Sequence, residues 1–223
     1  MKIYVISIFP HIFDSFLDTS LIKKAQQKNI IQFETIDPRD FALWMHRQVD
    51  DTVYGWWEWL LMKAQPIIDA LESCISRIVW DFMIIYPSPS SVFFDQNHAK
   101  TYAQYQNIIF LCGRYEWIDA RVELYINDHY PMKLQKLSLW RFVVYGWEVP
   151  SMIMIEAITR MVPWCIHQIP AQESYDDHAT SLLEYPQYTK PAEIHWYQVP
   201  DVLMSGHHQA IQDWKETHFG SIL

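Results

Sequence analysis

Glycine is scarce in this sequence. Only 5 of the 223 residues are glycine, whereas about 7% would be usual. There is no Gly-x-Gly-x-x-Gly run and no phosphate-binding loop, so the nucleotide folds that depend on these motifs have no support. Tryptophan is abundant instead, with 11 residues, and several of them stand in turns where glycine would be expected.

Cysteine is also rare. Cys74, Cys112 and Cys165 are the three cysteines, and none belongs to a Cys-x-x-Cys pair. This spacing argues against a disulfide framework or a zinc site and fits a reducing cytoplasm. The apolar residues 1–9 are interrupted by Pro10, so they are too short for a signal sequence or a membrane span and are predicted to form a buried strand.

Positive charge is in deficit. The net charge is −9, from 17 basic and 26 acidic residues, which disfavours a protein that coats nucleic acid non-specifically but is compatible with a local basic pocket. A hydrophobic content of 50% with 19% charged residues is typical of a globular protein. The length suits one large domain, alone or with a small appendage.

Apolar runs alternate with amphipathic segments, which predicts an α/β domain with a mainly parallel sheet. Strands are expected at residues 3–9, 30–36, 82–86, 107–111 and 142–145. Helices are expected at 10–17, 21–27, 60–76, 118–127 and 150–163, with a short helical appendage from 199. The polar, aromatic segment 44–59 is expected to be an irregular loop, and Pro66 is expected to break or kink the helix around it.

The stretch 112–119 is central to this pattern. It follows the apolar run 107–111 and precedes Ile118, Val122 and Ile126, whose spacing predicts the inner face of a helix. It is therefore a strand-to-helix turn at the carboxyl end of a strand, where open α/β sheets place their ligands.

Two further turns, 86–91 and 138–150, are expected at the same sheet edge, where the three would grip a small ligand through backbone amides. Three ordinary connections are the alternative interpretation. Cys112 ends an apolar strand, so a core thiol is a better interpretation than a nucleophile.

Polar clusters near the helix end at 163 suggest acid–base chemistry. Arg160 precedes Glu173, Asp176 and Asp177, and a carboxylate beside a guanidinium can remove a proton and stabilise the resulting anion. A helix-end arginine and a solvated acidic loop explain the same residues without catalysis. The spacing of Asp176, Asp177 and His178 predicts no metal site.

Ordered motifs over almost the whole chain resemble the bacterial tRNA (guanine-N1)-methyltransferases, a branch of the knotted SPOUT superfamily. These motifs include Pro38-Arg39-Asp40-Phe41, His46-Arg47, Val49-Asp50-Asp51, Tyr54-Gly55, Ser88-Pro89, Cys112-Gly113-Arg114-Tyr115-Glu116, Gly146, Glu148, Pro150, Glu184-Tyr185-Pro186-Gln187-Tyr188 and Leu203-Met204-Ser205-Gly206.

The resemblance implies a mainly parallel sheet with helices on both faces and a C-terminal trefoil knot, in residues 1–165. A linker at 166–181 and a shortened helical C-terminal domain at 182–223 would follow. The resemblance also implies a cytoplasmic homodimer, without a membrane segment, whose active site lies between subunits. The substrate would be N1 of the guanine 3′ of the tRNA anticodon, and the methyl donor S-adenosylmethionine, with Mg²⁺ assisting.

The same resemblance assigns residue roles. The cofactor would contact three loops through Tyr86, Ser88, Pro89, Gly113, Tyr115, Glu116, Trp117, Ser138, Leu139, Trp140, Arg141, Phe142, Val143, Val144, Gly146 and Pro150. The tRNA would contact His46, Arg47, Asp50 and Arg114. Guanine N1 carries a proton, so it needs a general base, and the family's aspartate matches Asp176, with Asp177 and Glu173 as alternatives. Arg160 would stabilise the charge that develops on O6.

The sequence departs from the family pattern mainly at glycines. Tryptophan stands at such positions at Trp56, Trp57, Trp59, Trp117, Trp140, Trp147 and Trp164, and Arg141 stands where the family has an acid. A non-glycine residue forced into a glycine conformation costs about 1–3 kcal/mol. A second hypothesis is therefore an impaired or redesigned scaffold of this fold, with indoles blocking the cofactor cleft and at most an RNA-binding role.

Overall fold

The computed structural model describes residues 1–43, 46–114, 117–165 and 184–218, with residues 56–58 as backbone only. The chain divides into two units, residues 1–167 and 168–223. None of the helices in the described ranges is long and apolar enough to cross a membrane.

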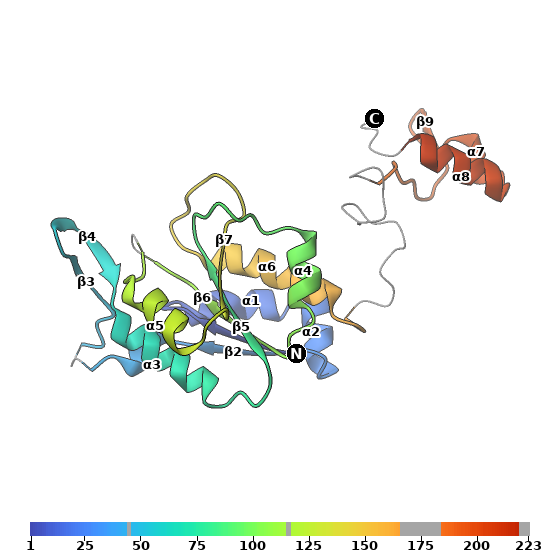
Figure 1. Ribbon diagram of the computed structural model, residues 1–223. Coiled ribbons are helices and arrows are strands. Elements are labelled where there is room, and N and C mark those ends of the chain that lie inside the picture. The colour runs from blue at the N-terminus through green and yellow to red at the C-terminus, as the bar shows by residue number, and fades with distance from the viewer. Residues whose placement is uncertain (44–45, 115–116, 166–183, 219–223) are drawn as a thin grey trace. The chain divides into compact units, whose positions relative to one another are not determined.

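A five-stranded sheet in the order β2-β1-β6-β5-β7 forms the centre of the first unit (Figure 1). Every pairing within it is parallel, which confirms the predicted mainly parallel sheet. Its strands are β1 (Lys2–Ile6), β2 (Gln32–Ile36), β5 (Phe82–Pro87), β6 (Asn107–Leu111) and β7 (Leu134–Leu137). Every residue of β6 is buried, as expected for a central strand covered on both faces.

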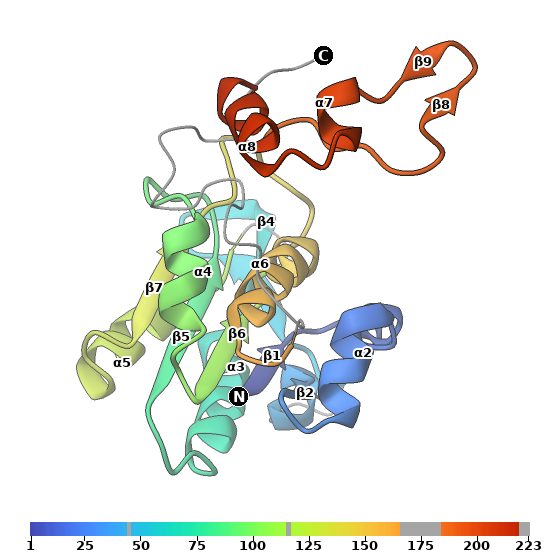
Figure 2. The same ribbon diagram turned by 90° about the vertical axis from the view of Figure 1, so that its right-hand side faces the viewer.

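Helices cover both faces of this sheet, as predicted (Figures 1 and 2). One face packs against α3 (Ala64–Ile75) and α5 (Arg121–His129), and the other against η1 (Pro10–Phe13), α4 (Gln96–Tyr102) and α6 (Glu148–Met161). The remaining helices of this unit are α1 (Asp14–Leu17), α2 (Ser20–Gln27) and the 3₁₀ helix η2 (Pro38–Phe41). Asp95 caps α4 by accepting a hydrogen bond from the backbone N–H of His98 at 2.9 Å.

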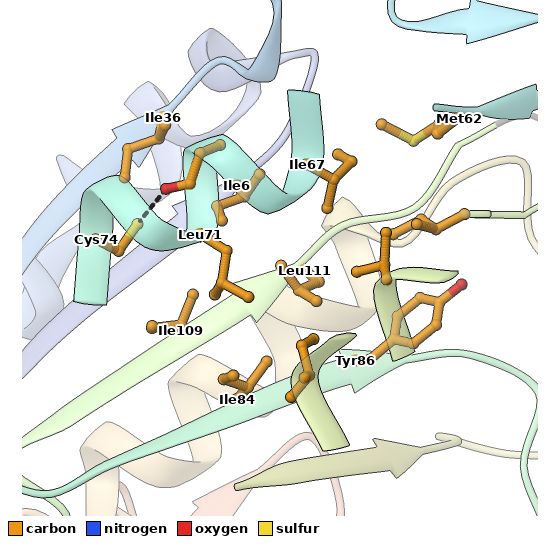
Figure 3. Close-up of a cluster of buried hydrophobic side chains, with 14 of the residues drawn as sticks. Ile6, Ile36, Met62, Ile67, Leu71, Cys74, Ile84, Tyr86, Ile109 and Leu111 are labelled. Atoms are coloured by element: carbon orange, nitrogen blue, oxygen red, sulfur yellow. Dashed lines mark hydrogen bonds between the residues drawn. The ribbon is translucent and has the colours of Figure 1, made fainter. Parts of the chain in front are cut away.

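Alternate residues of each central strand enter opposite cores. In β1, Tyr4 and Ile6 join the core beneath α3, whereas Ile3 and Val5 join the core beneath α6. Figure 3 shows the first of these cores, where Ile6, Ile84 and Leu111 meet the α3 side chains. Each such side chain contributes about 1.5–3 kcal/mol on burial, so these two cores fix which strand ends lie together.

The segment predicted to be irregular is instead largely a β-hairpin. β3 (Asp50–Val53) pairs antiparallel with β4 (Trp56–Met62), and Gly55 at the turn has φ +84°. Because β4 runs to Met62, the helix expected from residue 60 begins at Ala64. Pro66 is then the third residue of α3, where its missing N–H has no intrahelical acceptor, so the predicted break does not occur.

The last strand of the sheet was also placed wrongly. Residues 142–145 form an exposed loop, with Val143 at 81% and Tyr145 at 98% exposure, and the strand is β7 instead. β7 is a partly buried edge strand with two polar residues in four, so it lacks the apolar pattern of its neighbours. Pro150 is the third residue of α6, not the first, because the helix begins at Glu148.

The second unit contains a short antiparallel pair and two helices. β8 (Glu193–Ile194) pairs with β9 (Tyr197–Gln198), and α7 (Asp201–Met204) and α8 (His208–Thr217) follow. Trp214 on α8 stacks on His218, with ring centroids 4.2 Å apart, and meets Tyr185 and Tyr188 edge-on at 6.3 Å. Aromatic contacts therefore tie Tyr185 and Tyr188 to α8.

Candidate active site

A cleft of about 980 Å³ opens where the parallel strands end. Four loops line it, each following the carboxyl end of a strand of the sheet. The lining residues are Ile8 and Phe9 after β1, Pro89 after β5, Arg114 and Trp117 after β6, and Val143, Val144, Tyr145 and Trp147 after β7. The three turns singled out in the sequence therefore converge, and the loop after β1 joins them.

Backbone hydrogen bonds hold these loops to one another. The N–H of Trp147 donates to the carbonyl of Gly113 at 3.2 Å, and the N–H of Ser88 donates to the carbonyl of Leu137 at 3.0 Å. On the other side, the N–H of Met62 donates to the carbonyl of Trp117 at 3.0 Å. The end of β4 thus supports the loop after β6, and the cleft wall is continuous with the hairpin.

Gly113 precedes Arg114 in the loop after β6 and lies among three side chains. A methyl group added there would stand 3.4 Å from Ile118, 3.6 Å from Trp147 and 3.6 Å from Tyr86. These are ordinary van der Waals separations, and the backbone at Gly113 is not in the left-handed region. The absence of a side chain at Gly113 therefore leaves a narrow space between the rings of Tyr86 and Trp147, and the backbone there needs no conformation special to glycine.

Gly146 has a stricter requirement. A Cβ atom at this position would overlap the Nε, Cζ and Cδ atoms of Arg114, whose side chain lies directly against the glycine. The guanidinium of Arg114 also stands over the ring of Phe9, with Cζ 4.7 Å from the ring centroid. Arg114 is thus enclosed by two loops that line the cleft.

A buried carboxylate fixes this arginine. Glu148, the first residue of α6, is 0% exposed and accepts a hydrogen bond from Arg114 Nε at 2.7 Å. Its other oxygen accepts from the hydroxyl of Ser7 at 2.8 Å. Sequence reasoning gave Glu148 and Ser7 no role, although an acid at the start of an apolar helix was the available signal.

Tyr86, at the end of β5, is held neutral. Its side chain is buried, and this burial raises the pKa of the phenol to about 12. The Nζ of Lys136 stands 5.5 Å from the ring centroid. Tyr86 therefore contributes a protonated phenol beside Gly113, and its ring makes a cation–π contact with Lys136.

Cys112 is a buried thiol, as the sequence predicted. Its Sγ lies 3.1 Å from Ser151 Oγ, and burial raises its pKa well above the ordinary value. A thiol held protonated in this way is a poor nucleophile. Cys74 is also buried, with its pKa raised to about 12 by burial, whereas Cys165 is partly exposed.

We expect Cys165 to be the thiol that reacts first with a thiol reagent at pH 8. A pKa near 12 leaves Cys74 with about a thousandfold less thiolate than an ordinary thiol. Mass spectrometry after iodoacetamide treatment should find label at Cys165 in the native protein and at all three cysteines in urea. Cys165→Ser is the control and should abolish the native label. Rapid native labelling of Cys112 would contradict its place in the core.

The structure brings only part of the predicted cofactor set to the cleft. Pro89, Trp117, Val143 and Val144 line it. Trp140 and Arg141 instead pack on Phe93, with ring centroids 5.5 Å apart for Trp140 and Cζ 6.0 Å from the ring for Arg141. The described members of the set that lie elsewhere than the lining are Tyr86, Ser88, Gly113, Ser138, Leu139, Trp140, Arg141, Phe142, Gly146 and Pro150. Tyr115, Glu116 and Asp176 lie outside the described residues.

Only one of the four residues expected to contact tRNA lines the cleft. Arg114 is in the cleft, whereas His46, Arg47 and Asp50 are not among its lining residues. The Arg47 side chain pairs with the carboxylate of Asp40 and donates from Nε to the carbonyl of Arg39 at 3.2 Å. The exposed surface around His46 is therefore organised by the 3₁₀ helix η2 and not by the cleft.

Arg160 also lies apart from the cleft lining. It stands in the last turn of α6, as predicted, and borders a separate cavity of about 210 Å³. Glu156 and Thr159 of the same helix contribute to that cavity, together with residues from α1 and α2. In residues 1–43, 46–114, 117–165 and 184–218, no group of three potential ligands could hold a metal ion.

Comparison with known proteins gives a consistent result. Residues 1–220 match the family model described as tRNA (Guanine-1)-methyltransferase TrmD. A tRNA (guanine-N(1)-)-methyltransferase of Latilactobacillus sakei is 37% identical over 216 residues, covering 97% of this chain and 85% of that protein. The proteins of the same name from Mycoplasma capricolum and Clostridioides difficile are 38% and 35% identical over 219 residues, covering 97% and 96% of this chain and 85% and 90% of their own lengths.

Proposed function

Because this chain belongs to the tRNA (guanine-1)-methyltransferase family, we propose that it transfers a methyl group from S-adenosylmethionine to N1 of the guanine 3′ of the tRNA anticodon. The cleft at the carboxyl ends of the strands carries the proposal. Its position is where open α/β sheets bind their ligands, and its volume of about 980 Å³ is large enough for a cofactor with a purine ring.

The cleft lining suits such a cofactor chemically. Val143, Val144 and Pro89 offer apolar surface for a purine, and Trp117 offers an aromatic edge. Among the described lining residues, Arg114 is the single charged side chain, and it offers N–H donors to a carboxylate. When bound there, the cofactor supplies an electrophilic methyl group next to the substrate.

Asp176 and Arg160 supply the proton chemistry in this proposal. The carboxylate of Asp176 accepts the N1 proton of guanine, and the freed electron pair on N1 takes the methyl group as the bond from that carbon to the cofactor sulfur breaks, which leaves S-adenosylhomocysteine. The guanidinium of Arg160 stabilises the charge that grows on O6. Asp177 and Glu173 remain the alternatives for the base.

We propose that two copies of the chain complete one active site, with the trefoil knot of the family in each copy. The position of Arg160 supports this, because in a single chain it borders a different cavity from the one that Arg114 lines. A site that needs both groups would then draw them from two subunits. Assistance by Mg²⁺ stays a prediction from the resemblance.

A second candidate is an RNA-binding scaffold of the same fold whose cofactor cleft is blocked. The observation in its favour is that two indoles, Trp117 and Trp147, line the cleft. Trp147 is only 8% exposed and packs against Gly113, whereas Trp117 is 42% exposed. Trp117 is therefore the indole that competes most directly with a ligand.

Calorimetry with S-adenosylhomocysteine separates the two candidates. We expect the chain to bind it with a dissociation constant well below ~1 mM, since a cleft of this size buries most of such a ligand. Methyl transfer to unmodified tRNA, followed by nucleoside analysis for 1-methylguanine, then tests the reaction. Trp117→Gly is the matched variant. Binding by Trp117→Gly but not by the unaltered chain would establish the blocked cleft and contradict the enzyme proposal for this sequence.

A further inference from the structure

The proposed reaction gives Ser7 and Glu148, which lie behind Arg114, no role of their own. Glu148 is fully buried between two elements that are far apart in the sequence, the loop after β1 and the loop after β6. A buried ion pair is generally no more stable than apolar side chains of similar volume. Stability alone therefore gives little reason for a carboxylate at this position.

The contacts of Arg114 at the cleft give a functional reason for the carboxylate of Glu148. A guanidinium carries five N–H donors in a rigid plane, and Glu148 takes the Nε–H of Arg114 at 2.7 Å. Within the described residues, no side chain or carbonyl accepts from the terminal Nη1 and Nη2 groups of this arginine. The N–H groups of Nη1 and Nη2 can donate two parallel hydrogen bonds, and the ligand groups that match this geometry best are the paired oxygens of a carboxylate or a phosphate.

Two further contacts limit where this plane can turn. The ring of Phe9 lies 4.7 Å from Cζ, and Gly146 lies directly against the side chain from Nε to Cδ. The backbone N–H of Arg114 donates to Sδ of Met62 at 3.2 Å, so the base of the side chain is also fixed. The Arg114 side chain is thus held at Nε by Glu148 and lies against Phe9 and Gly146, while the residue lines the cleft.

We propose that Glu148 is a positioning residue that holds the terminal N–H groups of Arg114 ready for an oxyanion of the ligand in the cleft. The proposal rests on the methyltransferase function proposed above. The oxyanion has two possible sources, the carboxylate of the cofactor's amino-acid portion and a phosphate of the tRNA. Because Arg114 and Glu148 together carry no net charge, the site acts through directed hydrogen bonds and not through excess positive charge.

Glu148→Met and Glu148→Gln distinguish positioning from charge. Methionine removes the acceptor and leaves one more positive charge in the cleft, so a purely electrostatic role predicts tighter anion binding. Positioning predicts weaker binding, on the order of 10-fold, because the Nη groups lose their orientation. Glutamine keeps an oxygen for Nε, so binding is expected to stay within about threefold of the unaltered chain. Thermal unfolding of each variant checks that it is folded.

The source of the oxyanion follows from which ligand is affected. Affinity is measured for S-adenosylhomocysteine, for 5′-methylthioadenosine, which lacks the carboxylate, and for unmodified tRNA. If the cofactor carboxylate is the ligand, Glu148→Met weakens S-adenosylhomocysteine but not methylthioadenosine. If a tRNA phosphate is the ligand, only tRNA binding weakens. Unchanged or tighter binding of all three ligands by folded Glu148→Met would overturn the proposal.

A double-mutant cycle tests whether Glu148 acts through Arg114. In Arg114→Met, the further change Glu148→Met is expected to have no added effect on affinity, and removing both partners also avoids an unpaired buried charge. Ser7→Ala is the matched control, since it removes the other partner of Glu148 and leaves the Arg114 contact. Additive losses would overturn the positioning role. Binding by the unaltered chain in the same assays tests the proposed function separately.

Discussion

Replacing Asp176 by alanine is expected to slow methyl transfer to tRNA by about 10²–10⁴-fold, the usual cost of removing a general base. Guanine N1 is protonated at neutral pH, so its electron pair is not available until a carboxylate accepts the proton. The measurement is a single-turnover assay with saturating cofactor, which isolates the chemical step from product release.

Asp177→Ala and Glu173→Ala are the matched controls, since each removes one acid from the same stretch. We expect both to stay within about tenfold of the unaltered chain, below the loss typical of a removed base. All three variants should bind S-adenosylhomocysteine and tRNA with unchanged affinity. A full loss in Asp177→Ala or Glu173→Ala, with Asp176→Ala active, would move the base to that residue.

Gly146→Ala is expected to destabilise the first unit by about 3–5 kcal/mol, the cost of breaking a buried ion pair by displacing one partner. The new Cβ atom would occupy the space of the Arg114 side chain, which must then leave Glu148. The carboxylate of Glu148 would keep only the hydroxyl of Ser7. For a unit of this size, each kcal/mol lowers Tm by about 2–4 °C, so differential scanning calorimetry can measure the effect.

Gly113→Ala is the control for this prediction. It adds the same methyl group to the neighbouring loop, but at ordinary contact distances from Ile118, Trp147 and Tyr86. We expect a change of less than about 1 kcal/mol, within the range for a well-accommodated substitution. Equal losses of stability in the two variants would contradict the special position of Arg114 against Gly146.

The sequence was sufficient to predict the sheet where strands are buried on both faces. β1, β5 and β6 are continuous apolar runs, and each was placed within a few residues of its true bounds. Prediction failed at β7, because this edge strand is only partly buried while the more apolar loop 142–145 is exposed. Apolar content alone does not separate an edge strand from an exposed loop when burial depends on distant elements.

The position of the site was predictable, but its internal contacts were not. Strand ends in a parallel sheet meet at one edge, so the turns after β5, β6 and β7 could be grouped from the sequence alone. The pairing of Arg114 with Glu148 joins residues 34 positions apart, and that of Ser7 with Glu148 joins residues 141 positions apart. No local pattern records such contacts. Trp140 was expected at the cleft, but its ring packs against the ring of Phe93 instead.

The order of strands in the sheet also constrains how the chain can fold. β1 pairs with β6, which follows it far along the chain, so Lys2 must wait for Asn107 before that ladder can close. Pairings between such distant segments lose loop entropy before they gain contacts, which makes folding slow. Until β6 emerges, the cores on both faces of the sheet lack the apolar side chains of this central strand. This interval is when a nascent chain would be most prone to aggregate or to engage a chaperone.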